Sequence, residues 1–218
     1  MINRITRGDC IEVMAAMPEA SIDFILTDPP YLVNYRDRSG RRVRNDNNTS
    51  WLHPAFAQMH RVLKDNSFAV SFYSWSRIDL FMQAWAQAGF TVAGHIVFAK
   101  EYSSATRYLQ YRHEQAYLLM KGRPLSPGFP IPDIIPWTDY TGNKLHPTQK
   151  PEAILKPLIH AFTGPGHTVL DPFCGSGSTL AAARSIGRNF VGIELDRRHF
   201  RTAATRLFTG KTPSPASR

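Results

Sequence analysis

Cysteine is scarce in this 218-residue chain, which contains only Cys10 and Cys174, and neither belongs to a Cys-x-x-Cys pair. A disulfide framework and a zinc site are therefore not expected, and a reducing compartment is the natural setting. No apolar run is long enough to cross a membrane, and the first residues lack the apolar core of a secretory signal. These absences predict a cytoplasmic protein with no metal and no membrane partner.

Acidic residues are also few, because 17 Asp and Glu stand against 26 Lys and Arg, which gives a formal net charge of +9. A basic surplus of this size favours a polyanionic partner, since cations displace the counterions that condense on phosphates. Many soluble proteins are basic for no specific reason, so the charge alone leaves both interpretations open. The chain is 43% hydrophobic, which is enough for one domain with a sizeable core.

Strand and helix patterns alternate along the chain, which predicts an α/β fold with a mostly parallel, twisted sheet and helices on both faces. Strands are expected at residues 22–27, 67–73, 91–99, 115–120, 168–171 and 189–193, and helices at 51–63, 77–88, 151–162, 178–186 and 197–207. Pro157 predicts a kink or a late start in its helix. We expect a single domain over residues 1–208 and a disordered polar tail over 209–218.

Two motifs follow apolar strands at opposite ends of the chain. The first is Asp28-Pro29-Pro30-Tyr31, and the second is Asp171-Pro172-Phe173-Cys174-Gly175-Ser176-Gly177-Ser178-Thr179. In a parallel sheet both motifs open at the carboxyl edge of the strands, where α/β enzymes bind their ligands. The two motifs are therefore expected to form one site.

Together these motifs resemble the two halves of an S-adenosylmethionine-dependent methyltransferase that acts on the amino group of a nucleobase. The first motif is the catalytic half and the second is the cofactor half. This order resembles the permuted beta group of DNA amino-methyltransferases. The resemblance covers most of the chain and implies a Rossmann-like methyltransferase fold with a circularly permuted motif order. Beta-group relatives commonly dimerise, so the resemblance leaves a homodimer open, although the sequence itself does not give the oligomeric state.

The resemblance implies a binding site for S-adenosylmethionine around the second motif. It places the methionine part of the cofactor against the loop, with Phe173 packing over it. Glu194 ends the next expected strand, where a carboxylate can accept both ribose hydroxyls; the alternative is a carboxylate in the first turn of a helix. The cofactor residues of the motif itself are Asp171, Phe173, Gly175, Ser176, Gly177 and Ser178, and Asp28 of the first motif is counted as a cofactor contact as well as a catalytic residue.

Two further segments match the cofactor half of the family. His146-Pro147-Thr148-Gln149-Lys150-Pro151 resembles an element that opens a helix in the beta group, and it implies that His146, Thr148 and Lys150 bind the cofactor carboxylate. A simple helix start with proline in its first turn is the alternative. Near the N-terminus Asp9 is implied to accept the adenine amino group of the cofactor, with Cys10 beside it, although alone Asp9 would be read as a helix cap.

The chemistry of an exocyclic amino group explains the first motif. Its lone pair is delocalised into the ring, so two acceptors must draw on its two N–H bonds and stabilise the positive charge that develops on nitrogen. The acceptors are the Asp28 carboxylate and the Pro29 carbonyl, which Pro29 and Pro30 pre-aim by fixing φ. Tyr31 offers a face for the base, and a base in double-stranded DNA must flip out to reach it. The alternative is a rigid loop after a strand.

Asp at position 28, rather than Ser, resembles adenine-N6 enzymes more than cytosine-N4 enzymes. The leading interpretation is therefore a site-specific DNA adenine-N6 methyltransferase. A cytosine-N4 or RNA amino-methyltransferase, and a non-catalytic nucleic-acid-binding subunit with the same fold, remain as alternatives. His113-Glu114 resembles a late catalytic-region motif, but we assign it a structural role first.

Two segments are expected to contact DNA. Residues 34–50 form a basic loop, expected to be mobile, whose arginines can bind phosphates or guanine edges; a solvated charge run is the alternative. Residues 121–145 form a short, proline-rich segment expected to recognise the target with an aromatic surface. The short segment predicts a short or degenerate target sequence; the alternative is that a second subunit or partner supplies the missing contacts. The DNA-binding candidates are Arg36, Arg38, Arg41, Arg42, Arg44, Trp137 and Tyr140.

Overall fold

The computed structural model describes residues 2–35, 44–103, 108–138 and 149–209. An eight-stranded sheet in the order β1-β8-β7-β2-β3-β5-β4-β6 crosses the molecule. In chain order the strands are β1 (Arg4–Arg7), β2 (Ile22–Thr27), β3 (Leu63–Phe72), β4 (Thr91–Lys100), β5 (His113–Lys121), β6 (Ile134–Trp137), β7 (Thr168–Asp171) and β8 (Asn189–Glu194). Within the described residues β5 alone runs antiparallel to its neighbours, which confirms the expected mostly parallel sheet.

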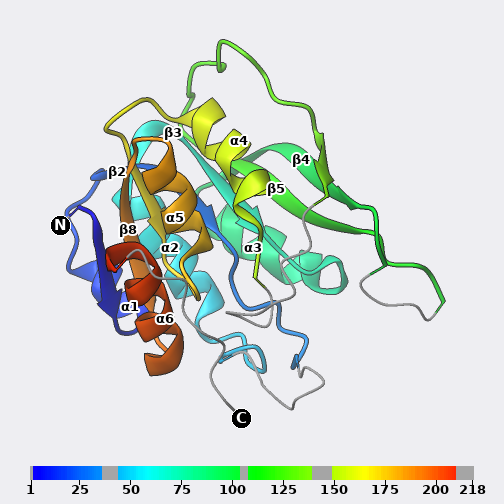
Figure 1. Ribbon diagram of the computed structural model, residues 1–218, viewed down its shortest axis with the longest axis horizontal. Coiled ribbons are helices and arrows are strands. Elements are labelled where there is room, and N and C mark those ends of the chain that lie inside the picture. The colour runs from blue at the N-terminus through cyan, green and yellow to red at the C-terminus, as the bar shows by residue number, and fades with distance from the viewer. Residues whose placement is uncertain (1, 36–43, 104–107, 139–148, 210–218) are drawn as a thin grey trace.

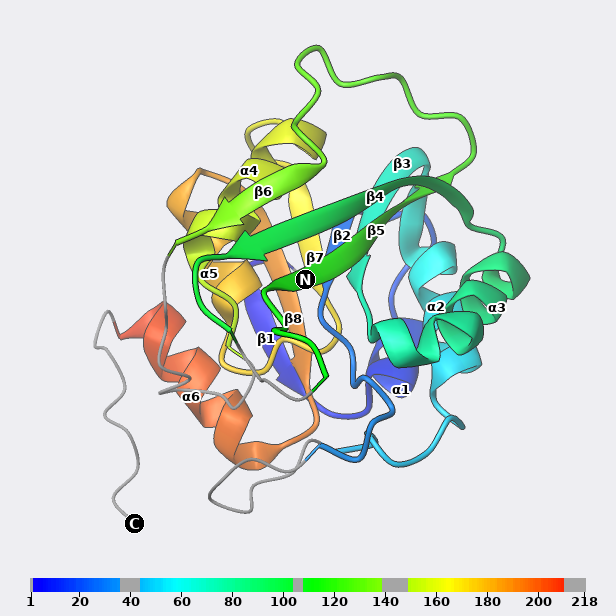
Figure 2. The same ribbon diagram turned by 90° about the vertical axis from the view of Figure 1, so that its right-hand side faces the viewer.

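Helices cover both faces of the sheet (Figures 1 and 2). The helices are α1 (Cys10–Ala15), α2 (Leu52–Val62), α3 (Ile78–Ala88), α4 (Glu152–Phe162), α5 (Ser178–Ser185) and α6 (Arg197–Phe208), with a 3-10 turn at Trp75–Arg77. Helices α1, α2 and α3 pack on one face, and α4, α5 and α6 pack on the other, so that two hydrophobic clusters sandwich the sheet. β2 lies between both clusters, which explains its almost continuous apolar sequence.

The helix boundaries follow from local chemistry. The Asp196 side chain caps α6 by accepting hydrogen bonds from the Arg198 and His199 N–H groups. Gly187 follows α5 with φ of +74°, which a glycine adopts without strain. α4 begins at Glu152 and contains Pro157 in its interior, so the late helix start considered for that proline does not occur.

Besides the 3-10 turn, three elements were not expected from the sequence: β1, α1 and β6. β6 matters most for function, because it shows that the proline-rich segment 121–145 is not wholly irregular. It pairs in parallel with β4 at the edge of the sheet, where Pro136 is tolerated because only one side of the strand needs ladder hydrogen bonds. Trp137 in this strand is only 3% exposed, so the expectation that it provides an aromatic surface is wrong.

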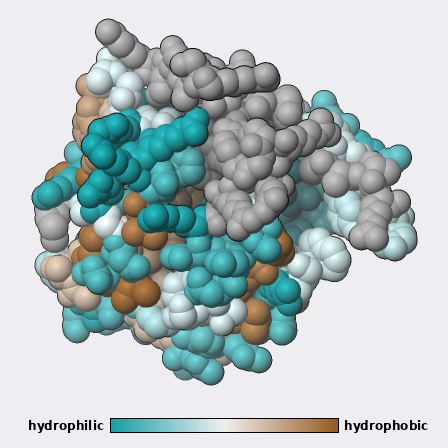
Figure 3. Space-filling model, turned by 90° about the horizontal axis from the view of Figure 1, so that it is seen from below, coloured by the Kyte–Doolittle hydropathy of each residue, from teal (hydrophilic) through white to brown (hydrophobic). Residues whose placement is uncertain are grey.

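The parallel strands all point their carboxyl ends to one edge of the sheet, which we call the catalytic edge. The loops after β1, β2, β7 and β8 open there, and the antiparallel β5 begins there. Figure 3 views the molecule from this edge, where hydrophobic residues lie among hydrophilic ones. No helix in the described part of the chain is long and apolar enough to cross a membrane.

Candidate active site

Two adjoining cavities lie at the catalytic edge and bring the two sequence motifs together. The larger has about 990 Å³ of empty space, including its opening to solvent. The smaller has about 340 Å³ on the same basis. Asp28, Phe173 and Gly175 line both cavities. A ligand that extends through both would therefore touch the first motif and the second at once.

Asp28 carries the most heavily contacted carboxylate of the site. Its Oδ1 accepts a hydrogen bond of 2.7 Å from the Tyr31 hydroxyl, and its Oδ2 lies 2.6 Å from the Lys150 Nζ. The same ammonium group lies 3.3 Å from the Tyr31 oxygen. Tyr31 therefore does more than present its ring, because its hydroxyl helps to hold the carboxylate.

Lys150 lies in a different environment from the one implied by the resemblance. Its ammonium bridges Asp28 and Glu114, with 3.1 Å between Nζ and the Glu114 Oε2. On its other oxygen Glu114 accepts a hydrogen bond of 2.5 Å from the Lys100 Nζ. Lys150 also lines the smaller cavity, so a ligand there could still approach it.

Burial controls the protonation of this cluster. Desolvation raises the pKa of Asp28, Lys150 opposes that rise, and the negative charge of Glu114 adds to it. The pKa of Glu114 is lowered, because its two lysine neighbours outweigh the effect of burial. Burial and the Asp28 charge keep the pKa of the Tyr31 hydroxyl well above its usual value, so this hydroxyl stays protonated and donates.

Glu194 ends β8 beside the glycine loop, as the sequence predicts. Its Oε2 accepts a hydrogen bond of 2.8 Å from the Gly175 N–H, and its Oε1 accepts one of 2.7 Å from the Asp196 N–H. The first turn of α6 begins only after Asp196, so Glu194 is not a first-turn helix residue. Its carboxylate lines the larger cavity, and burial raises its pKa.

Asp9 and Cys10 line the larger cavity near Glu194. Asp9 is the N-cap of α1, and its Oδ1 accepts a hydrogen bond of 2.8 Å from the Ile11 N–H. The helix-cap interpretation of Asp9 is therefore correct, and its place in the cavity leaves a ligand contact available as well. Burial raises the pKa of the Cys10 thiol to about 12, so this group is an uncharged part of the wall.

Asp171 lies at the end of β7, in the wall of the smaller cavity, and is 3% exposed. It accepts a hydrogen bond of 3.2 Å from the Phe173 N–H. Burial, followed by the charges of Asp28 and Glu194, raises its pKa to about 7, although the Thr179 hydroxyl opposes this rise. No ion pair joins Asp171 to a cationic side chain of the described residues.

The other residues of the second motif either line a cavity or support the fold. Phe173 packs edge-on against Trp51, with ring centroids 5.1 Å apart, and Ser176 and Ser178 line the smaller cavity. Gly177 has φ of +79°, and a Cβ there would lie 3.1 Å from the Ala203 Cβ of α6. This glycine is therefore explained by backbone conformation and helix packing.

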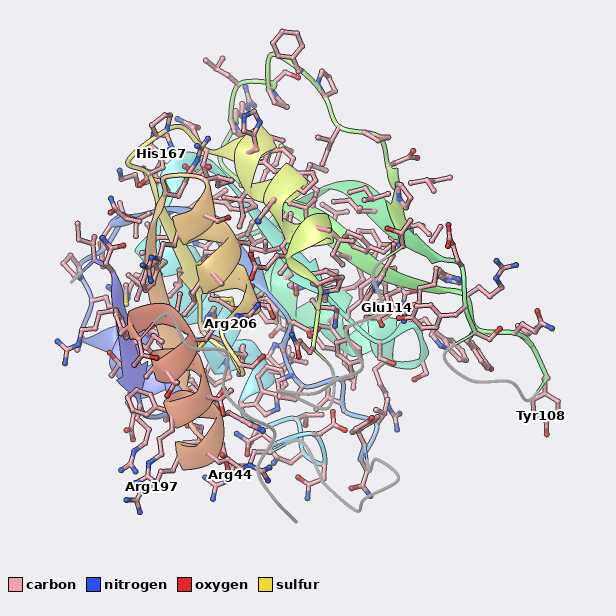
Figure 4. All side chains as sticks on the ribbon, in the orientation of Figure 1. Arg44, Tyr108, Glu114, His167, Arg197 and Arg206 are labelled. Carbon is pink, nitrogen blue, oxygen red and sulfur yellow. The ribbon has the colours of Figure 1, made fainter. Side chains whose placement is uncertain are left out.

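Asp46 joins the two described ends of the basic segment. It is 2% exposed, and its carboxylate accepts hydrogen bonds from the Leu32 N–H (2.7 Å) and the Tyr35 N–H (2.5 Å). Arg44 is exposed and lines the larger cavity, at the open lower edge in Figure 4. Other predicted site residues lie outside the described part of the chain: Arg36, Arg38, Arg41, Arg42, Tyr140, His146 and Thr148.

Sequence reasoning missed Glu114 and Lys100 as members of the site. Glu114 is the second residue of β5 and Lys100 is the last residue of β4, so the antiparallel pairing of these strands brings both to the catalytic edge. The one available signal was the His113-Glu114 pair before an apolar strand, which we assigned a structural role. Among the described residues no group of three or more His, Cys, Asp or Glu side chains could hold a metal ion.

The chain is similar in sequence to known proteins over most of its length. A family model described as DNA methylase matches residues 22–131 and 121–205. A protein of Escherichia coli (strain K12) that carries the name methylase YubD is 53% identical over 206 residues, which cover 94% of this chain and 90% of that protein. Both matches span the two motifs.

Solved structures agree with this result. The crystal structure of the M1.HpyAVI–SAM complex superposes with a TM-score of 0.76 and 27% identity, covering 94% of this chain and 98% of that one. The PvuII DNA methyltransferase (cytosine-N4-specific) has a TM-score of 0.77 at 16% identity, covering 94% and 86%, which supports the fold alone. The family match and the extensive identity show that this chain belongs to the DNA methylase family.

Proposed function

We propose that this chain transfers a methyl group from S-adenosylmethionine to the N6 amino group of adenine in DNA. The observation that carries the proposal is the meeting of the Asp28–Tyr31 loop and the glycine loop at two adjoining cavities. One cavity system thus holds acceptors suited to an amino group and carboxylates suited to the cofactor. The order of the two motifs along the chain supports membership of the permuted beta group.

Three carboxylates fit the cofactor. Glu194 would accept the ribose hydroxyls, and Asp9 would accept the adenine amino group, since both line the larger cavity. Asp171 supplies an independent test of fit: it is buried, has a raised pKa, and forms no ion pair with a described cationic side chain. The ammonium group of the methionine part would provide the missing positive charge.

Replacement of Glu194 by Gln should weaken binding of S-adenosylmethionine about ten- to a hundredfold, because a charged hydrogen bond is worth about 1.5–3 kcal/mol. The fold should survive, since the amide oxygen can keep one of the two backbone hydrogen bonds. Titration calorimetry measures the effect. The matched control is Glu12→Gln, which changes an exposed carboxylate on α1. Equal cofactor affinity in both variants would contradict the ribose role of Glu194.

The first motif provides the chemistry at the target amino group. S-adenosylmethionine supplies an electrophilic methyl group when bound. Asp28 and the Pro29 carbonyl would each accept one N–H of the amino group, which localises its lone pair. Each Asp28 oxygen has one donor in this structure, and a carboxylate oxygen can accept two, so capacity remains. Asp28 would also receive the proton that the methylated nitrogen releases, because its raised pKa favours proton uptake.

Access to this site requires an extruded base. The Asp28 side chain is largely buried, and the cavity is closed on several sides by the loops after β1, β2, β7 and β8. A base stacked within duplex DNA cannot reach such a position, so the target nucleotide would flip out of the helix. The ring of Tyr31 would then provide a stacking face beside the two acceptors.

Nucleoside analysis tests the proposed reaction directly. Purified protein incubated with labelled S-adenosylmethionine and unmethylated double-stranded DNA should yield N6-methyladenine. N4-methylcytosine as the sole product would replace adenine by cytosine, and label in RNA alone would overturn DNA as the substrate. Absence of transfer to any nucleic acid, from protein that binds the cofactor, would contradict the catalytic assignment.

A surface beside the catalytic loop is suited to DNA. Trp75 is 60% exposed and stacks on Tyr111, with ring centroids 6.4 Å apart and an interplanar angle of 15°. Arg77, on the same 3-10 turn, donates a hydrogen bond of 3.2 Å to the Leu32 carbonyl, next to Tyr31. Arg112 is exposed beside this pair in sequence. Exposed aromatic rings interleaved with arginines typically stack bases and contact phosphates.

The Trp75→Ala variant should bind DNA about five- to a hundredfold more weakly, because base stacking on an aromatic side chain contributes about 1–3 kcal/mol. Cofactor affinity should not change, since Trp75 does not line either cavity. Fluorescence anisotropy with labelled duplex measures the effect. Phe129→Ala is the control, because Phe129 is 92% exposed but lies on the loop between β5 and β6, beyond the opposite edge of the sheet. Equal losses in both variants would contradict a specific role for Trp75.

A further inference from the structure

We propose that Glu114, held by Lys100, is a positioning residue that fixes Lys150 against Asp28. This inference rests on the proposed function, because it assigns Asp28 the role of acceptor for the target amino group. It concerns two residues, Glu114 and Lys100, that do not belong to either sequence motif. Glu114, labelled in Figure 4, is the second residue of β5 and is half-buried.

The Lys150 ammonium has three N–H bonds and three oxygen neighbours. These are the Asp28 Oδ2 at 2.6 Å, the Glu114 Oε2 at 3.1 Å and the Tyr31 hydroxyl at 3.3 Å. An ammonium group donates at most three hydrogen bonds. The three neighbours therefore define both the position and the rotation of this group, and Glu114 is the only one of them outside the Asp28–Tyr31 loop.

Lys100 secures Glu114 from the other side. Its side chain is 4% exposed, its Nζ lies 2.5 Å from the Glu114 Oε1, and the same nitrogen sits 4.5 Å from the centroid of the Trp137 ring. Lys100 and Trp137 pair in register between β4 and β6. A buried lysine is stable only when it is paired, and the aromatic ring adds cation–π attraction. The edge strand β6 thus supports the catalytic centre through Lys100.

Four charges of alternating sign result: Lys100, Glu114, Lys150 and Asp28. With two cations and two anions the cluster is formally neutral, which limits the cost of burying it. Without Glu114 the ammonium of Lys150 could donate more of its hydrogen bonds to Asp28, and these bonds would occupy more lone pairs of the Asp28 carboxylate. By sharing Lys150, Glu114 leaves the Asp28 carboxylate with acceptor capacity for the target amino group.

The charge of Glu114 also acts on Asp28 at a distance. The groups that face the Asp28 carboxylate are Lys150, Tyr31 and Glu114, with Asp171 at the end of neighbouring β7. Of these, Glu114 raises the pKa of Asp28 and Lys150 lowers it. Removal of the Glu114 charge should therefore lower the pKa of Asp28. Turnover requires ionised Asp28 and is lost as the pH falls through that pKa, so the acid limb of kcat should move to lower pH.

The first test is Glu114→Gln, which removes one charge at almost constant volume. We expect kcat to fall about ten- to a hundredfold, as misplacement of a catalytic group typically causes. The dissociation constant for S-adenosylmethionine should stay the same, and the acid limb of kcat should shift to lower pH. The control is Asp65→Asn, which makes the same type of change at an exposed carboxylate that pairs with Lys121 at the opposite end of β5. It should leave kcat and its pH profile unchanged.

Two further variants keep the proposal testable if Glu114→Gln does not fold. Lys100→Met retains an unbranched side chain over Trp137 and removes the second partner of Glu114, and it should lower kcat in the same direction. Lys100→Arg should restore part of the loss, since it restores the charge. At a pH above the acid limb, where the direct effect of Glu114 on the pKa of Asp28 no longer matters, the combination of Glu114→Gln with Lys150→Met should cost no more in kcat than Lys150→Met alone, because Glu114 then acts through Lys150.

Nuclear magnetic resonance of the lysine ammonium groups provides a readout that does not depend on activity. Glu114→Gln should shift the signals of both Lys100 and Lys150, whereas Asp28→Asn should shift mainly that of Lys150. The proposal is overturned if Glu114→Gln leaves these signals or the pH profile of kcat unchanged. It is also overturned if the double variant shows additive losses. Failure of the wild-type protein to methylate DNA would instead reject the proposed function, and the ammonium signals would still decide the placement of Lys150.

Discussion

Asp28→Asn should lower kcat by about two to three orders of magnitude, the usual cost of losing a group that stabilises developing charge. The substitution keeps the shape of the side chain but removes its negative charge, and its amide nitrogen can turn a donor toward the target amino group. Lys150 would remain paired with Glu114, so the fold should persist. Single-turnover kinetics with saturating DNA and cofactor measure the loss.

Cofactor binding separates this effect from a general disturbance of the site. The Asp28→Asn variant should bind S-adenosylmethionine as tightly as the wild type, because the proposed contacts come from Asp9, Asp171 and Glu194. Turnover near that of the wild type would contradict the assignment of Asp28 as an acceptor. A parallel collapse of cofactor affinity would move Asp28 from the catalytic group to the cofactor group.

The sequence predicted those parts of the site that lie in contiguous motifs. Asp28 directly follows β2, Glu194 ends β8 and Gly175 lies in the loop after β7, and strand ends in a parallel sheet meet at one edge. Their convergence therefore followed from local patterns and a general rule of topology. The expected helices and strands were found for the same reason, since long periodic segments carry most of the signal.

Contacts between distant segments could not be predicted in this way. Lys150 and Asp28 are 122 positions apart in the sequence. Glu114 lies on β5, which runs antiparallel to its neighbour β4. Only the order of the strands determines that the ammonium reaches these two carboxylates. The motif that contains Lys150 suggested a ligand contact, whereas the His113-Glu114 pair gave only a resemblance to a late catalytic-region motif and did not indicate Lys150 as a partner.

For Trp137 the sequence predicted a functional role that the structure does not support, because the composition of its segment suggested an exposed aromatic surface. The segment around it is rich in proline, which indicates irregular structure, and an aromatic residue there was expected to face DNA. A four-residue edge strand at Ile134–Trp137 instead turns the ring inward, over Lys100. Short edge strands carry little periodic signal, and Pro136 removes what remains. The exposed ring of Trp75 instead stacks on Tyr111, and these two residues belong to no motif.

The affinity for S-adenosylmethionine should fall about tenfold for each unit by which the pH drops below about 7. Asp171 has its pKa raised to about 7 by burial in the ligand-free protein, so it becomes protonated in this range. A bound ammonium group would lower that pKa, because opposite charge favours the carboxylate. Binding at lower pH must therefore expel a proton, and calorimetry in buffers of different ionisation enthalpy measures its release.

Asp171→Asn supplies the matched variant for this effect. Its cofactor affinity should be weak and nearly independent of pH, since the amide carries no charge. Whereas its cofactor affinity should be lower than that of the wild type, the free energy of unfolding of the variant should be higher. The folded-state pKa of Asp171 lies above the usual value of 3.8, so wild-type stability falls as the pH rises from about 4 to about 7. The variant avoids this penalty, which amounts to at most about 4 kcal/mol for a shift of roughly three pKa units.

The two measurements together distinguish a ligand contact from a structural carboxylate. A residue that serves only the fold would lower stability when replaced and would leave the pH dependence of cofactor binding intact. A residue that awaits a cation should do the reverse: Asp171→Asn should melt at a higher temperature than the wild type near pH 8 and bind S-adenosylmethionine less tightly. Wild-type affinity that stays constant between about pH 5.5 and about pH 8 would exclude Asp171 as the partner of the cofactor ammonium group.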